Sequence, residues 1–178
     1  MAAASINAEN SHPILQSCIA WLLSPSGETL QVRVFLDSGC EKSLIRRDVA
    51  HRLGLDGPTE DLCLVGIGGK TLKPTKEKIV KFRLRSRDGK YTTQQLSACT
   101  SEKITNPLRM VNVDPKSFDH LKDLPIADEF PRGEVQVDVL IGVDFYDLLL
   151  CGGVVRGKPQ EPVALETKLG YVLSGVSE

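Results

Sequence analysis

The segment VFLDSGCEKSLI, residues 34–45, joins an alternating apolar strand directly to an Asp-Ser-Gly turn. In the strand that leads into the turn, Val32, Val34 and Leu36 point to one face, because successive side chains of a strand alternate. Asp and Ser bond their own backbone and Gly tolerates a positive φ, so the turn has a structural interpretation. The alternative interpretation is that the strand presents Asp37 rigidly because its carboxylate does chemistry.

Short strands and turns surround this segment over most of the chain. Turn-forming residues, such as the Asp88-Gly89 pair, separate apolar stretches that alternate with polar residues. Strands are expected at 14–23, 30–36, 62–65, 78–85, 91–99 and 135–142, with two or three more between 153 and 176, and short helices at 46–54 and 143–150. This pattern is typical of a mostly β domain folded as a barrel or a sandwich.

The length of the chain favours a single well-buried domain, which we assign to residues 13–178. Residues 1–12 are expected to be a disordered tail or an addition to the natural chain. Four prolines prevent long regular elements between residues 101 and 133, and the sequence leaves the role of this segment open.

Composition and charge exclude several classes of protein. The 22 basic and 23 acidic residues nearly balance, and the one basic stripe, residues 76–90, alternates with apolar residues as the solvated face of a strand does. No nucleic-acid partner is therefore expected. The chain has no apolar leader and no run of about 18 apolar residues, so neither signal-directed secretion nor a membrane partner is expected.

The cysteines and histidines do not form recognised motifs. The five cysteines are widely spaced and include no CxxC pair, which argues against a zinc site or a disulfide framework and favours an intracellular, reducing setting. The three histidines, His12, His51 and His120, are isolated, so a metal centre and a Ser-His-Asp triad both lack support. No metal and no cofactor are expected.

The Asp-Ser-Gly turn gains weight from the motifs that follow it. A second hydroxyl comes at Ser43, a glycine-rich loop at Gly66 to Gly69, and an apolar segment, Leu140-Ile141-Gly142, just before the second helical stretch. This order resembles that of the retroviral-type aspartic proteases, in which Asp-Ser/Thr-Gly is followed by a glycine-rich flap and by an apolar segment that ends in Gly and runs into a helix.

The resemblance extends beyond these motifs over most of residues 30–176. The chain is similar to the aspartic peptidase region of Pao/BEL-type LTR retrotransposon polyproteins in four segments: KITNPL, HLKDLPIADEF, VDVLIGVDFYDLL and GGVVRGKPQEPVALETKLGYVLSG. This resemblance implies a retropepsin-like closed β-barrel with one or two short helices. It also implies that the terminal GYVLSG strand builds a sheet between two protomers.

The activity that the resemblance implies is that of an aspartic endopeptidase, which processes a Gag-Pol-type polyprotein in the cytoplasm or within virus-like particles. Such an enzyme activates water between two Asp carboxylates, and this chain has one Asp-Ser-Gly. The implied partners are therefore a second copy of the chain, in a homodimer, and a polypeptide substrate.

The resemblance also assigns roles to individual residues. Asp37 is the catalytic carboxylate, and Ser38 and Gly39 position it. The flap tip that covers the substrate is formed by Gly66, Ile67, Gly68 and Gly69, and the catalytic loop is supported by Ser43, Leu140, Ile141 and Gly142. The chain departs from the family at two positions, with Cys40 where a small residue is usual and Val143 where an Arg often braces the loop.

Several alternatives remain open at this point. The loop of residues 66–69 is also compatible with a plain hairpin turn, and Ser43 with a helix N-cap. The role of Cys40 is open. A retropepsin-like domain that binds peptides or dimerises without cleaving is the alternative to an enzyme.

Overall fold

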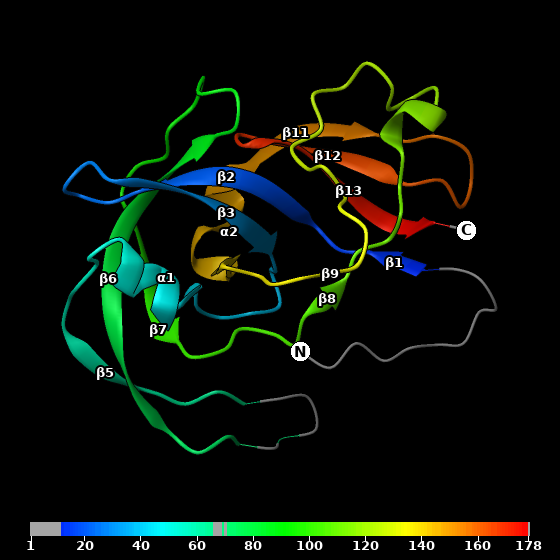
Figure 1. Ribbon diagram of the computed structural model, residues 1–178. Coiled ribbons are helices and arrows are strands. Elements are labelled where there is room, and N and C mark those ends of the chain that lie inside the picture. The colour runs from blue at the N-terminus through cyan, green and yellow to red at the C-terminus, as the bar shows by residue number, and fades with distance from the viewer. Residues whose placement is uncertain (1–11, 66–68, 70, 178) are drawn as a thin grey trace.

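The computed structural model describes residues 12–65, 69 and 71–177 (Figure 1). Three sheets, one of them the two-stranded pair of β8 and β9, together with two short α-helices and one 3-10 helix make up this part of the chain. In chain order the elements are β1 (His12–Ile14), β2 (Ser17–Leu23), β3 (Thr29–Leu36), β4 (Leu44–Arg46), α1 (Arg47–Arg52), β5 (Thr59–Leu62), β6 (Thr75–Ser86), β7 (Leu96–Ser101), β8 (Leu108–Arg109), η1 (Pro115–Ser117), β9 (Glu134–Val135), β10 (Val139–Ile141), α2 (Val143–Leu149), β11 (Leu150–Val155), β12 (Val163–Thr167) and β13 (Gly170–Ser177).

The larger sheet closes into a barrel. Its strands follow the order β2-β3-β10-β4-β7-β6, and β2 also pairs with β6, which completes the ring. The remaining strand, β5, pairs with the outer end of β6 and forms a hairpin that extends away from the barrel at the bottom of Figure 1. The expectation of a mostly β closed barrel with one or two short helices is confirmed.

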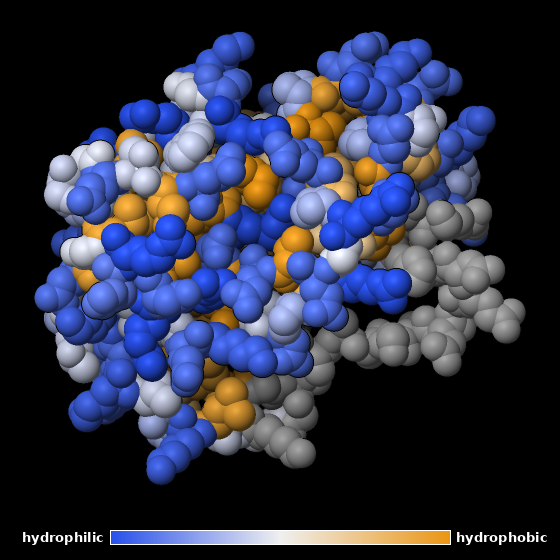
Figure 2. All heavy atoms as spheres, viewed as in Figure 1, coloured by the Kyte–Doolittle hydropathy of each residue, from blue (hydrophilic) through white to orange (hydrophobic). Residues whose placement is uncertain are grey.

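Alternation along the strands fills the interior of the barrel. Val34, Ile45 and Val139 on three neighbouring strands are completely buried and belong to one core cluster. On β6, Phe82 points inward while Lys81 and Arg83 beside it are exposed, so the basic stripe is a solvated strand face there. Figure 2 shows patches of hydrophobic residues that reach the surface between hydrophilic ones on this side of the molecule.

The second sheet has four strands in the order β1-β13-β12-β11 and lies beside the barrel in Figure 1. A separate core cluster joins this sheet to the segment between β8 and β9, because Leu121 and Phe130 of the segment belong to it together with Ala164 and Leu173 of the sheet. The GYVLSG motif lies in β13, which has β12 on one side and β1 on the other. β1 pairs only with residues 175–177, and a single bridge joins Tyr171 to Ile126. The part of this strand in an intermolecular sheet therefore stays a prediction.

Three expected strands are shorter or broken. The strand expected at 14–23 is interrupted at Leu15 and Gln16, so that its first part joins the second sheet as β1. The strand expected at 135–142 is split into β9 and β10, and at the break the Asp138 carboxylate accepts the N–H of Arg33 at 2.8 Å. The expected strand 91–99 has ladder pairing only from Leu96.

Among the described residues, no helix is both long and apolar enough to span a membrane. Residues 1–11, within the expected N-terminal tail, lie outside the described part of the chain, and His12 already belongs to β1.

A buried carboxylate ties α1 to the hairpin arm. Glu77 of β6 is 3% exposed, and its Oε1 and Oε2 accept hydrogen bonds from Arg47 at 2.5 Å and from Thr100 at 2.7 Å. Burial raises the pKa of Glu77, but the hydrogen bonds from Arg47 and Thr100 and the charge of Arg47 outweigh it. The net effect is a pKa below the ordinary value of 4.5.

Replacement of Glu77 by Gln is expected to lower the free energy of unfolding by about 1–3 kcal/mol at neutral pH, because bonds to a charged acceptor are lost. A folded-state pKa below the unfolded one stabilises the protein above the unfolded value, and this contribution disappears as the pH falls through the folded value. Urea unfolding of both proteins at several pH values should therefore show curves that converge below pH 4.5. A difference that persists unchanged in acid would contradict this interpretation.

Candidate active site

The Asp-Ser-Gly turn holds the Asp37 carboxylate at the end of β3. The backbone N–H of Asp37 donates to the carbonyl of Ile141 at 2.9 Å, and its Oδ1 accepts the N–H of Gly39 at 2.9 Å. Asp37 is 8% exposed, whereas Ser38 and Gly39 are exposed. The turn thus fixes the carboxylate from the protein side and leaves the next two residues accessible from outside.

The position of β10 brings the Leu140-Ile141-Gly142 segment to this turn. β10 lies between β3 and β4, the two strands that precede and follow the turn, and runs parallel to β3. Leu140 pairs with Phe35 on one side and with Leu44 on the other. Segments about 100 residues apart in the sequence therefore meet at the end of the strand that carries Asp37.

Ser43 joins the loop to the start of α2. Its hydroxyl donates to Oδ1 of Asp144 at 2.7 Å and accepts the N–H of Gly142 at 3.0 Å, and its own N–H donates to Oδ2 of Asp144 at 3.0 Å. The helix that follows begins only at Arg47, with Arg46 as its N-cap. Ser43 is therefore not the N-cap of this helix, and its hydrogen bonds instead join the loop to the start of α2.

The sequence analysis did not identify Asp144 as a site residue. Its carboxylate accepts two hydrogen bonds from Ser43 and so braces the loop. The available signal was an acidic residue in the first turn of the helix after Leu140-Ile141-Gly142. That position alone is compatible with a favourable helix-dipole interaction and does not indicate the contact with Ser43.

Gly142 allows the loop and α2 to approach closely. A Cβ atom at this position would lie 2.6 Å from the carbonyl oxygen of Cys40 and 2.8 Å from the carbonyl carbon of Lys42. Both are backbone atoms, so any larger side chain would displace the loop that carries Asp37.

Replacement of Ser43 by Ala is expected to lower the free energy of unfolding by about 1–3 kcal/mol, because the buried N–H of Gly142 loses its acceptor. Hydrogen exchange of the Gly142 amide should accelerate in the same variant. The matched control is Ser97→Ala on β7, a half-buried residue whose replacement should cost less than about 0.5 kcal/mol. Equal losses in the two variants would show that the Ser43 contacts do not support the loop.

The described residues on both sides of the glycine-rich segment form the β5–β6 hairpin. The arms pair from Thr59 with Lys78 to Leu62 with Thr75, and a further bridge joins Val65 to Thr71. Gly69 has a positive φ of 75°, as tight turns require. Gly66, Ile67 and Gly68 lie outside the described residues, so their role in a flap tip stays a prediction.

An apolar cluster connects the hairpin to the surroundings of Asp37. Leu62 and Leu64 of the hairpin belong to the same cluster as Phe35, Leu140 and Cys40, which lie beside the Asp37 turn. The segment that follows β7 joins this cluster through Ile104 and Leu108. Part of the segment 101–133 thus packs beside the candidate site, and the remainder covers the second sheet.

Cys40 is an unsuitable nucleophile in this setting. Burial raises the pKa of its thiol, and the nearby charges of Asp37 and Asp144 raise it further. The thiol also donates to the carbonyl of Lys42 at 3.2 Å, and the net pKa stays above the ordinary value. A raised pKa keeps the thiol protonated at neutral pH, and the thiolate is the nucleophilic form. In the described part of the chain, no three His, Cys, Asp or Glu side chains gather as metal ligands.

A comparison with protein-family models places these features in a family. The model described as "Putative peptidase (DUF1758)" matches residues 27–177, which include the Asp37 turn, Ser43 and the Leu140-Ile141-Gly142 segment. No curated protein matches the sequence significantly. The match covers the chain from just before β3 to the end of β13 and leaves open the type of peptidase and its substrate.

Proposed function

Because the chain belongs to this peptidase family, we propose that it is an aspartic endopeptidase in which Asp37 from each protomer of a homodimer forms the catalytic dyad. The observation that carries the proposal is the support of the Asp37 turn from two sides, by Gly39 and Ile141 and by the contacts among Ser43, Gly142 and Asp144. A carboxylate held this rigidly can be presented to its twin at a fixed distance.

The mechanism follows from the pairing of two carboxylates. Two such groups a few ångströms apart cannot both ionise easily, so they share one proton. The ionised carboxylate accepts a proton from water, whose oxygen attacks the scissile carbonyl carbon, while the protonated carboxyl donates to the carbonyl oxygen. The tetrahedral intermediate collapses with cleavage of the C–N bond, and the leaving amine takes up a proton. No covalent acyl-enzyme forms.

Exposed residues around the turn support a dimer at this surface. Ser38 and Gly39 are exposed beside the buried Asp37. Val143, whose N–H donates to the carbonyl of Cys40 at 2.7 Å, is 50% exposed. An apolar side chain in such a position favours contact with a partner, and a symmetric partner would bring its own Asp37 to the same place.

The substrate of the proposed enzyme is an extended polypeptide that lies between the dyad and the two flaps. In this position it can pair its backbone as an added strand. The flap tips, residues 66–69, close over it and exclude water from the site. From the resemblance to Pao/BEL elements, we propose that the natural substrate is a Gag-Pol-type polyprotein.

The test is cleavage of a broad peptide library at high protein concentration, with products identified by mass spectrometry. The proposal expects discrete cuts, and a rate per chain that falls on dilution as the dimer dissociates. Cuts by a protein that remains a monomer at all concentrations would contradict the shared dyad. No cuts by a confirmed dimer would favour a module that binds peptides without cleaving them.

A further inference from the structure

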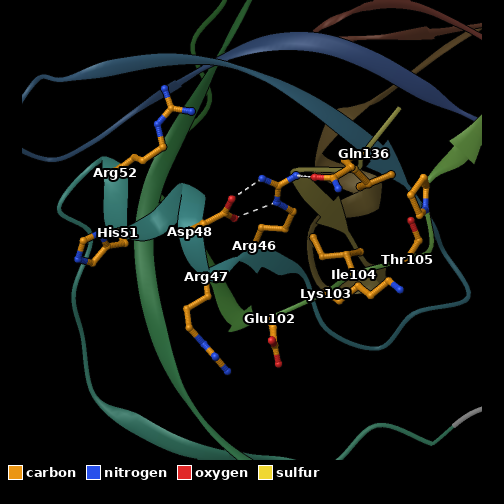
Figure 3. A pocket seen from close by; sticks show the side chains of 12 residues that line it. Arg46, Arg47, Asp48, His51, Arg52, Glu102, Lys103, Ile104, Thr105 and Gln136 are labelled. Carbon is orange, nitrogen blue, oxygen red and sulfur yellow. Dashed lines mark hydrogen bonds and ion pairs between the residues drawn. The ribbon is translucent and has the colours of Figure 1, made fainter. Parts of the chain in front are cut away.

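A groove of about 830 Å³ lies apart from the Asp37 turn, between α1 and the segment that follows β7 (Figure 3). Its size is within the range of ligand-binding pockets. The lining residues are Arg46, Arg47, Asp48, His51, Arg52, Glu102, Lys103, Ile104, Thr105, Pro107, Gln136 and Val137. Four cationic side chains thus face two anionic ones, although the chain as a whole has a net charge of −1.

The cations of the groove differ in their availability. Arg46 is held by Asp48, Gln136 and Asp138, so it belongs to the wall. In the described part of the chain, neither Arg52 nor Lys103 forms an ion pair.

Arg47 is partly available as well. One of its nitrogens bonds to Glu77, but its side chain is 53% exposed and retains further N–H donors. Arg52 and Lys103, which form no ion pair among the described residues, and the remaining N–H donors of Arg47 can therefore bind an external anion.

The arrangement of these cations favours an extended anion over a compact one. In Figure 3, Arg47, Arg52 and Lys103 come from separate places around the groove and point in different directions. A single phosphate group needs donors that converge on one point, and these side chains do not. A chain with several carboxylates along its length can contact them one after another.

The remaining lining residues favour a polypeptide over a nucleic acid. Ile104, Pro107 and Val137 give the groove an apolar part that can accept aliphatic side chains. No Phe, Tyr or Trp lines it, and stacking on aromatic side chains is the usual means of holding single-stranded bases.

The groove lies beside the proposed catalytic centre and is not part of it. The N–H of Arg46 donates to the carbonyl of Asp138 at 2.9 Å, just before β10, whereas Gly142 at the other end of β10 contacts the Asp37 loop. The three residues of β10 span about 10 Å. A peptide segment bound in the groove would therefore lie at least about three residues from the scissile bond.

We propose that this groove is a docking site for an acidic segment of a polypeptide substrate, outside the part that is cleaved. The inference rests on the proposed peptidase function for the identity of the partner as a substrate. The binding itself does not depend on catalysis, because the cations of the groove are distinct from Asp37.

The test measures binding to the Asp37→Asn protein, in which the substrate cannot be consumed. The probe is a short fluorescent peptide in which Glu alternates with Leu, and the measurement is fluorescence anisotropy. We expect the double variant Arg52→Gln, Lys103→Gln to weaken binding at least about fivefold, and added salt to weaken it further. The matched control removes two exposed cations on β6, Lys81→Gln with Arg83→Gln, and should bind as the parent does.

Three outcomes would overturn the proposal. One is equal weakening by the groove and control variants, and another is equal binding of a peptide in which Gln replaces Glu. The third is tighter, groove-dependent binding of single-stranded RNA, which would assign the groove to a nucleic acid. Because cleavage is not measured, failure of this test leaves the proposed peptidase function intact, and an inactive wild-type protein leaves this test valid.

Discussion

Replacement of Asp37 by Asn is expected to reduce the rate of peptide cleavage by a factor of roughly 10³ or more and to leave the fold intact. The amide oxygen of Asn can still accept the N–H of Gly39, so the turn keeps its geometry. An amide cannot take a proton from water or share one with a second carboxylate, so the acid–base chemistry is lost. The measurement compares initial rates of product formation by mass spectrometry, and urea unfolding checks that the two proteins are equally stable.

Mixing the two proteins tests whether the dyad is shared between chains. At a fixed amount of wild-type protein, an equal amount of Asp37→Asn should reduce the rate to about half, because mixed dimers contain one functional carboxylate. The mixture must be allowed to exchange subunits first. A rate that is unchanged by the variant, in a mixture shown to contain mixed dimers, would contradict the shared dyad.

Replacement of Asp128 by Asn is expected to lower the free energy of unfolding by about 3–5 kcal/mol, because it leaves the charge of Arg33 buried without a partner. Arg33 and Asp128 are each 7% exposed, and their side chains form an ion pair of 2.5 Å. The same carboxylate oxygen accepts the hydroxyl of Ser17 at 2.7 Å. The pair ties the segment before β9 to strands β2 and β3 of the barrel, so its loss should be apparent in chemical unfolding.

The double variant Arg33→Met, Asp128→Leu separates the ion pair from the packing around it. Removal of both charges leaves no unpaired ion, so this variant is expected to be more stable than Asp128→Asn alone. If the double variant is instead the less stable of the two, the loss in Asp128→Asn has a cause other than the unpaired charge of Arg33.

Local sequence patterns were sufficient to predict the type of fold. Alternation of apolar and polar residues on β3 and β6, with turn residues between strands, indicated a mostly β barrel before any tertiary information. The resemblance to retroviral-type proteases implied that Ser43 and the Leu140-Ile141-Gly142 segment support the Asp37 turn, and the structure brings these three parts together. The residues that flank the Gly66 to Gly69 loop pair as the arms of a hairpin, and the role of the loop itself stays a prediction.

Strand boundaries were less well determined, because they depend on pairing partners that are distant in the sequence. The strand expected at 14–23 divides between two sheets, since β13 provides a partner for residues 12–14 and β3 provides one for residues 17–23. No property of Leu15 or Gln16 alone marks this division.

The sequence by itself determined the chemistry that is available: one Asp-Ser-Gly at a strand end, a glycine-rich hairpin, and a second hydroxyl at Ser43. Only the tertiary structure decided how these groups are held, since the bonds of Ser43 with Asp144 and Gly142 join residues about 100 positions apart. It likewise gathered Arg47, Arg52 and Lys103 around one groove from two distant segments. Residue types and local periodicity are properties of short segments, whereas such contacts arise only when β10 inserts between β3 and β4 and the barrel closes.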